Sequence, residues 1–107
     1  MELVIVRDGS RELLVEQSCI REILIHPQIH EVPGAPPDIR GILLYGDEPA
    51  VIYRMGDGEA ICGIIMNGNQ DSLWGITGEP AGEEVRDADG LVSIMPGIWE
   101  NYSDTTE

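Results

Sequence analysis

Short apolar runs separated by polar, glycine-containing turns recur along the whole chain. The first two runs, residues 3–6 and 13–15, flank Asp8-Gly9, a pair that favours the backbone angles of a tight hairpin turn. Later runs cover residues 39–45, 50–55, 60–66, 72–77 and 91–95. Apolar runs of about five residues at this spacing are typical of strands in a small barrel or sandwich. The pattern therefore predicts an all-β protein.

Two short segments depart from this pattern and are predicted to form single helical turns. Ser18 can cap the first of them. It would place three apolar side chains on one face of the turn: Ile20, Ile23 and Leu24. The second predicted turn covers residues 83–86, within a polar stretch.

Turn residues define how the predicted strands connect. Asn67-Gly68 is the strongest short hairpin signal in the chain and joins run 60–66 to run 72–77. The segment "MGDGE" is also predicted to be a hairpin turn. Earlier in the chain, Pro27 biases His26 toward extended geometry.

A proline-rich segment precedes the run that begins at Ile39. Residues 32–35 fit a type II turn, with Pro33 at the second position and Gly34 at the third. Pro36 and Pro37 then favour polyproline-like geometry. We expect this stiff segment to fix the register of the next strand, because a slip by one residue would turn its apolar side chains outward. Gly41 would allow a bend or a close backbone approach.

Composition and charge narrow the class of partner. A chain of 107 residues forms one domain with a small core, and its apolar share of 42% includes no Phe. Twenty acidic and six basic residues give a net charge of −14, which disfavours binding to nucleic acid or to anionic membranes. A solvated, soluble surface is the simpler explanation of this charge, and an acidic docking face is the alternative. No apolar run approaches the length of a membrane span.

The two cysteines, Cys19 and Cys62, lie within apolar sequence, and the chain opens on a strand-like run without a signal segment. Buried free thiols in a reduced, cytoplasmic setting are therefore expected. Protonated thiols of this kind are inert. With no supported nucleophile–base pairing elsewhere, we expect no catalytic residue.

Three patterns suggest ligand sites, and each has a simpler explanation. His26 and His30 have a metal-ligating spacing only on a helix, which Pro27 excludes. The segment "RDADG" lacks most ligands of a calcium loop and fits a polar turn. The glycines of "GDGEAICG" do not have the spacing of a phosphate-binding loop. The sequence thus predicts neither a metal nor a cofactor.

One string, "CIREILIHPQIHEVPGAPPDIRGIL", resembles the CheW family of bacterial chemotaxis coupling proteins. The family has a Val-x-Glu-Ile-like element, then an Ile-x-x-Val-Pro-Gly-Ala-Pro-Pro segment, and then a strand that opens with a glycine after a basic or apolar residue. The matching residues are Ile20, Glu22 and Ile23, and then Ile29, Val32, Pro33, Gly34, Ala35, Pro36, Pro37, Ile39 and Gly41, with Arg40 as the basic residue.

This resemblance, which extends from Met1 to about Thr77, implies a fold and a function. CheW-like proteins consist of two small SH3-like β-barrels and have no enzymatic activity. They join a CheA-type histidine kinase, through its regulatory domain, to the cytoplasmic tip of a chemoreceptor. The implied partner-binding residues are Ile20, Glu22, Ile23, Val32, Pro33, Gly34, Pro36, Pro37, Ile39, Arg40 and Gly41. For the segment 33–41, a structural corner between the barrels has equal weight, and it could serve both purposes.

The chain also departs from the family pattern. Tyr45 stands where an arginine is often used at the receptor contact, and Tyr53 stands in place of an aspartate. The C-terminal hairpin that completes the second barrel in the family is missing, so we expect an incomplete barrel whose edge is capped by residues 91–95 or by a second copy in a homodimer. A divergent regulator that has lost receptor coupling is therefore the alternative function. A single domain over residues 1–102 and a disordered tail over 103–107 complete these expectations.

Overall fold

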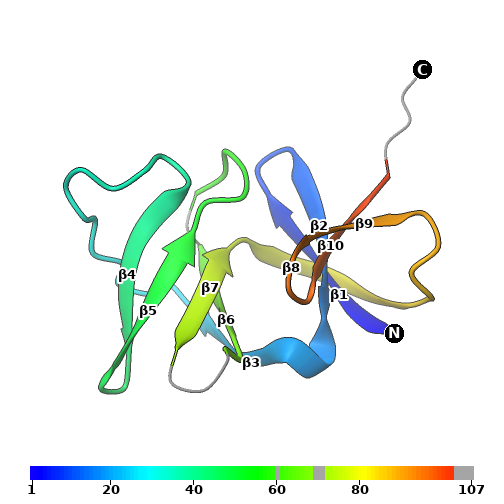
Figure 1. The fold of residues 1–107 in the computed structure, drawn as a ribbon, viewed down its shortest axis with the longest axis horizontal. Helices are drawn as coiled ribbons and strands as arrows, with labels where there is room; N and C mark the ends of the chain where they lie inside the picture. Colours follow the sequence, from blue (N-terminus) through cyan, green and yellow to red (C-terminus); the bar gives the residue numbers. More distant parts are fainter. Residues whose placement is uncertain (60, 69–71, 103–107) are drawn as a thin grey trace.

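The computed structural model describes residues 1–59, 61–68 and 72–102, which form two five-stranded sheets side by side along the long axis of the molecule (Figure 1). The first sheet has the strand order β8-β1-β2-β10-β9. Its strands are β1 (Glu2–Asp8), β2 (Arg11–Glu16), β8 (Glu79–Val85), β9 (Leu91–Met95) and β10 (Ile98–Asn101). All its neighbouring strands are antiparallel.

The second sheet has the strand order β3-β6-β7-β5-β4. Its strands are β3 (Ile20–Ile25), β4 (Ile39–Tyr45), β5 (Glu48–Tyr53), β6 (Cys62–Met66) and β7 (Leu73–Thr77). The β5–β7 pair is parallel and the other pairs are antiparallel. A short 3₁₀ turn, η1 (Gln17–Cys19), links the two sheets. The all-β prediction is confirmed. Within the described residues, no backbone ladder joins the outer strands of either sheet, so neither closes into a complete barrel.

Most predicted strand pairs are present. The hairpin of β1 and β2 turns through Gly9, whose φ is 64°. Strands β6 and β7 pair as the Asn67-Gly68 signal indicates, although their connection includes residues 69–71, which lie outside the described chain. The "MGDGE" segment is not a hairpin turn, because it joins β5 to β6, and these strands are not neighbours in the sheet.

Both helical turns are predicted at the wrong positions, because their residues lie mainly in strands. Among the described residues, only Gln17–Cys19 are helical, and Ile20–Ile25 form a strand paired with β6. A β-bulge lies between Ile20 and Glu22, so Ile20 pairs with Met66 and Ile23 with Ile64. The bulge places two apolar residues three positions apart on one face, which imitates helical spacing. Residues 83–86 belong mainly to β8, a polar strand whose pairing with β1 overrides its weak local signal.

The C-terminal segment also differs from the expectation. Residues 91–95 form β9, which does not cap the second sheet but pairs with β10 at the edge of the first. Strand β10, which the sequence pattern did not predict, pairs with β2 through Ile98 and Trp99. The C-terminal hairpin is therefore present and completes the first sheet. The predicted tail, residues 103–107, lies outside the described residues.

Strand β6 lies at the centre of the hydrophobic core, because it is buried along its whole length. Ile64 and Met66 pack in a cluster that also contains side chains from both sheets: Val4, Val6, Leu13, Val15, Ile76 and Ile98. Ile65 points to the opposite side of β6 and packs in a second cluster with Leu43, Ala50, Ile52 and Leu73. A strand buried on both faces is continuously apolar, as "CGIIM" is, rather than alternating.

A buried carboxylate joins the two sheets. Asp8, the last residue of β1, is 1% exposed, and its two carboxylate oxygens accept hydrogen bonds from the backbone N–H groups of Gly56 at 2.7 Å and Gly58 at 2.8 Å. A Cβ atom on Gly58 would lie 2.8 Å from the Asp8 carboxylate oxygen. The glycine-rich loop therefore does bind an anion through its backbone, but the anion belongs to the same chain.

Two arginines extend this junction. Arg11 of β2 donates to both carboxylate oxygens of Glu100 on β10, each at 2.8 Å, and to the backbone carbonyl of Met55 at 2.7 Å. These bonds raise the pKa of Arg11 and lower the pKa of Glu100. Arg40 of β4 donates to Thr77 Oγ1 at 2.9 Å and to the Gly58 carbonyl at 3.0 Å. Burial lowers the pKa of Arg40, and the nearby charge of Arg54 acts in the same direction.

The Asp8 junction leads to a first prediction. Replacing Asp8 by Ala leaves the Gly56 and Gly58 N–H groups without acceptors, so the free energy of unfolding should fall by about 2 kcal/mol or more. Urea denaturation followed by circular dichroism measures the change. Glu31→Ala, at an exposed position, is the control. A change within about 0.5 kcal/mol for Asp8→Ala, as at an ordinary surface site, would contradict this role.

The Arg11–Glu100 pair leads to a prediction of pH dependence. Because the folded pKa of Glu100 is lowered, its contribution to stability is present above the unfolded value of about 4.3 and is lost as the pH falls through the folded pKa. Both side chains are about one third exposed, so we expect Glu100→Gln to cost about 1 kcal/mol at neutral pH. This difference from the wild type should shrink toward pH 3 in urea titrations across pH. A difference that is independent of pH would exclude a charge contribution.

Candidate protein-binding surfaces

The partner-binding residues predicted from the sequence lie on two strands and the segment between them. Ile20, Glu22 and Ile23 belong to β3, which is an outer strand of the second sheet. Ile39, Arg40 and Gly41 open β4, which is the other outer strand. The two groups are therefore separate in the hydrogen-bonded order of the sheet.

Ile20 and Ile23 line an open groove between the two sheets, here called the β3–β8 groove, with a volume of about 550 Å³. Its opposite wall comes from the first sheet and includes Val4 of β1 with Pro80 and Gly82 of β8. Both isoleucines are partly buried and pack on the central core cluster. The β3 bulge is what brings them to the same wall. The sequence thus predicted these two residues correctly as neighbours, but on a strand rather than on a helical turn.

Glu22 faces a different neighbour. It accepts a short hydrogen bond from the hydroxyl of Tyr45, at the end of β4, and this bond raises the pKa of Tyr45. The contact links the two outer strands of the second sheet by their side chains. Tyr45 is the position where the family resemblance leads one to expect an arginine, so here a residue of the expected receptor contact is bonded within the chain.

The proline-rich segment forms an exposed projection. The backbone N–H of Ala35 donates to the Val32 carbonyl at 3.1 Å and the φ of Gly34 is 81°, which confirms the predicted turn. Val32 is 43% exposed, and Pro33, Gly34, Pro36 and Pro37 are exposed as well. Before this turn, His26 has a φ of 52°, so the extended geometry predicted for it is wrong. Its N–H instead bonds to the Ile61 carbonyl at 2.7 Å.

The start of β4 is packed against the rest of the sheet. Ile39 is partly buried, and Arg40 makes the bonds to Thr77 and Gly58 described above. Gly41 is buried where the chain crosses at His30, and a Cβ atom there would lie 2.8 Å from Ile29 Cγ2 and even closer to the His30 carbonyl. The close backbone approach predicted for Gly41 is confirmed.

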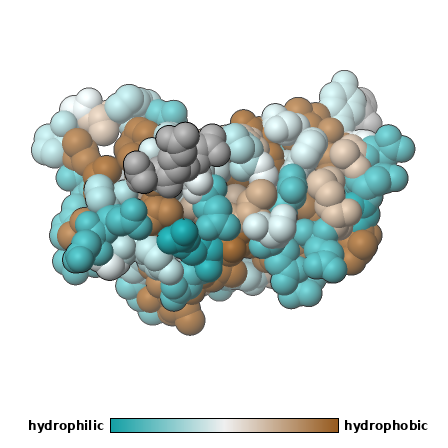
Figure 2. Space-filling model, turned by 60° about the horizontal axis from the view of Figure 1, so that its bottom comes forward, coloured by the Kyte–Doolittle hydropathy of each residue, from teal (hydrophilic) through white to brown (hydrophobic). Residues whose placement is uncertain are grey.

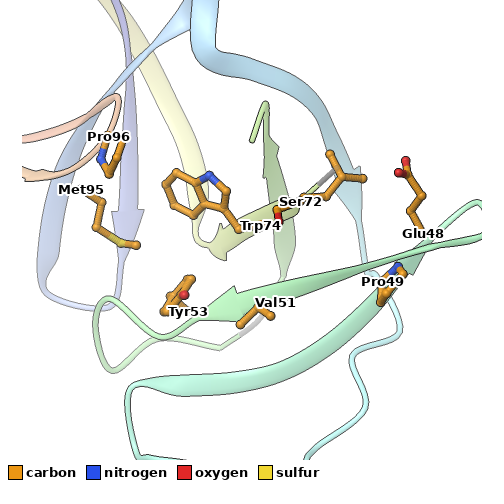
Figure 3. Close-up of a pocket in the computed structure, with 9 residues that line it drawn as sticks. Glu48, Pro49, Val51, Tyr53, Ser72, Trp74, Met95 and Pro96 are labelled. Carbon is orange, nitrogen blue, oxygen red and sulfur yellow. The ribbon is translucent and has the colours of Figure 1, made fainter. Parts of the chain in front are cut away.

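A second groove, here called the aromatic groove, was not predicted from the sequence (Figure 3). It has a volume of about 530 Å³ and lies between the second sheet and the β9–β10 turn. Its main lining residues are Pro49, Val51, Tyr53, Trp74, Met95 and Pro96. The alternation of Pro49, Val51 and Tyr53 in the sequence is the signal that these residues share one face of a strand. What they face depends on the distant residues 95 and 96, which no local pattern reveals.

Other side chains give no sign of a reactive centre in the described part of the chain. No group of three or more His, Cys, Asp or Glu residues there could hold a metal ion. Cys19 and Cys62 are free thiols, and burial raises the pKa of Cys62. Residues 87–90 form a local turn in which Asp89 N–H donates to Asp87 Oδ1 at 3.0 Å. Among the described residues, no helix is long and apolar enough to cross a membrane.

The surface view in Figure 2 shows apolar side chains in separate patches surrounded by hydrophilic ones. Large exposed apolar residues include Ile25 on β3, Leu44 on β4 and Val85 on β8, and these are 74%, 60% and 77% exposed. Each lies on an outer strand of its sheet. Exposed apolar residues that are scattered singly in this way are ordinary on a protein surface and do not by themselves mark a binding site.

Comparison with known proteins identifies the fold to which this architecture corresponds. The structure is similar to the crystal structure of the scaffolding protein TtCheW from Thermoanaerobacter tengcongensis, with a TM-score of 0.67 over 84% of this chain and 68% of that chain. Sequence identity over the match is 13%, so the likeness shows the fold. No family model matches the sequence, and no curated protein matches it either. The chain has a CheW-like fold of two SH3-like sheets, as the resemblance implied.

The Tyr45–Glu22 contact leads to a prediction about titration. In Glu22→Gln the carboxylate acceptor is lost, so the pKa of Tyr45 should fall toward its ordinary value of about 10. Ultraviolet absorbance of the tyrosinate measures this change, and Tyr45→Phe identifies which of the three tyrosines titrates late. An unchanged titration curve in Glu22→Gln would show that the hydrogen bond is not formed in solution.

Proposed function

We propose that this protein is a non-catalytic adaptor of bacterial chemotaxis signalling in the cytoplasm. Its partners are the regulatory domain of a CheA-type histidine kinase, the cytoplasmic tip of a chemoreceptor, or both. Two independent features support this function: the fold shared with TtCheW, a scaffolding protein, and the family-like residues between Cys19 and Leu43. The fold alone would leave the function open, since one fold serves many functions.

The β3–β8 groove is the single observation that carries the proposal. It combines Ile20 and Ile23, which the family resemblance assigns to a partner surface, with an open apolar surface between the two sheets. The mixture of apolar and polar lining suits a partner segment that inserts apolar side chains and leaves its polar groups near Gln17 and Glu83. An adaptor of this kind acts by presenting a binding surface to its partner proteins. Its specificity depends on how firmly the two sheets hold the groove walls in place.

A divergent regulator is the second candidate, and the Tyr45–Glu22 bond favours it. Glu22 would have to exchange this internal hydrogen bond for a partner contact, which reduces the gain from binding a receptor there. In this alternative the protein retains the CheW-like fold but has lost receptor coupling, and it binds another protein or a second copy of itself. Retained binding to a kinase domain without binding to a receptor fragment would favour this candidate.

A pull-down with matched variants tests the proposed groove. Immobilised wild-type protein should retain a CheA-type regulatory domain or a receptor fragment, and Ile23→Asp should weaken retention by about tenfold or more, because a charge would enter the apolar wall. Ile25→Asp is the matched control, since Ile25 lies on the same strand but is 74% exposed. Its retention should equal that of the wild type.

Two outcomes would contradict the proposal. If the wild type retained neither partner, the adaptor function would be wrong. If Ile23→Asp and the wild type retained a partner equally, with both folded by circular dichroism, the β3–β8 groove would not be the binding surface.

A further inference from the structure

The shape of the aromatic groove suits an extended peptide segment. Pro49, Val51 and Tyr53 alternate along β5 and so share one face, and Trp74 of β7 lies opposite Val51 in the parallel pair. From residue 49 to residue 53 the floor is about 13 Å long, at about 3.3 Å per residue. The turn at Met95 and Pro96 forms the opposite wall, at the end of the groove nearest Trp74 and Tyr53 (Figure 3).

Two aromatic rings define one end of this floor. The Tyr53 and Trp74 rings meet edge to face, with centroids 6.0 Å apart and an angle of 75° between their planes. Trp74, which lines the groove, also carries an indole N–H for which the described residues supply no hydrogen-bond acceptor. The other tryptophan, Trp99, donates its N–H to Glu16 at 2.7 Å.

Charge favours a basic occupant. Glu48 lies at the end of the groove away from Met95 and Pro96, and no cation pairs with it within the described part of the chain (Figure 3). The chain has a net charge of −14. Most of its arginines are already hydrogen-bonded within the protein: Arg7, Arg11, Arg21, Arg40 and Arg86. A partner segment carrying arginine is therefore attracted, and an acidic one is repelled.

We propose that the aromatic groove binds an extended, proline-containing segment of a partner protein that carries arginine near one end. Prolines in polyproline II geometry pack on aromatic floors, and their segment needs little ordering on binding. The carbonyl groups of such a segment are free acceptors for the Trp74 N–H. Its arginine would lie by Glu48. This site is separate from the β3–β8 groove, so the proposal does not depend on the adaptor function.

A second copy of this chain is a poorer occupant. Its own exposed prolines, Pro33, Pro36 and Pro37, lie between Glu31 and Asp38, which would approach Glu48 with like charge. Two molecules that each carry a charge of −14 also repel each other. The basic segment of a different protein therefore fits the charge of the groove better.

Tryptophan fluorescence tests this binding directly. In the variant Trp99→Phe, Trp74 is the only tryptophan and reports on the groove alone. The probe is a synthetic peptide about ten residues long, blocked at both ends, with proline at every third position and two arginines at one end. We expect a saturable change in Trp74 emission. Glu48→Gln should weaken binding by about threefold, as for an exposed ion pair, whereas Glu31→Gln should leave it unchanged.

Calorimetry with Trp74→Phe tests the indole donor. This change keeps an aromatic ring in the floor but removes the N–H, so peptide affinity should fall by about fivefold. Thermal unfolding of the variant confirms that it remains folded. An affinity equal to that of the wild type would remove the hydrogen bond from the proposal.

Several results would overturn the proposal. One is the absence of a saturable change in Trp74 emission with the arginine peptide at millimolar concentration. Another is equal binding of a peptide in which glutamates replace the arginines. A change in Trp74 emission on dilution of the protein alone, together with dimers in light scattering, would identify a second copy as the occupant instead.

Discussion

The Asp8 carboxylate, enclosed by the N–H groups of Gly56 and Gly58, fixes how the two sheets are placed relative to each other. Asp8 ends β1 of the first sheet, whereas the loop that binds it leaves β5 of the second. Arg11 adds a bond to the same loop at the Met55 carbonyl, and Arg40 adds one at the Gly58 carbonyl. Because a buried acceptor that loses its donors is costly, the loop and the strand end form one unit. Both grooves have one wall from each sheet, so their shapes depend on this unit.

The hydrophobic core also holds the two sheets together, through burial of apolar side chains rather than through hydrogen bonds. Strand β6 supplies Ile64 and Met66 to the cluster between the sheets and Ile65 to the cluster within the second sheet. Burial of apolar surface holds the sheets together, but it is not directional, and the hydrogen bonds of Asp8 and the arginines specify the orientation. Few charged residues are used in this way, and most carboxylates of the described residues remain on the surface, where their charge contributes little to the fold.

Local patterns predicted most of the strands, the Gly9 hairpin and the Val32–Ala35 turn, because each depends on residues adjacent in sequence. They also predicted the close approach at Gly41 from the glycine itself, although the residue that it approaches, His30, is distant in the chain. They failed at β3, where a bulge gives Ile20 and Ile23 a helix-like spacing, and at β8, whose exposed polar residues are strand only through their pairing with β1. Ile20 and Ile23 were found from the family resemblance. The aromatic groove was missed because Tyr53 and Trp74 meet Met95 and Pro96 only in the folded chain.

Native-state hydrogen exchange at two amides tests the central claim, that the loop around Asp8 is as stable as the core it joins. The Gly56 and Gly58 amides, although they belong to a loop, should exchange only on global unfolding, with the same free energy as core amides of Ile64 and Ile76. Exchange of these two amides at the rate of an open loop, while the core amides stay protected, would show that the sheets are not locked by Asp8 and would contradict the account.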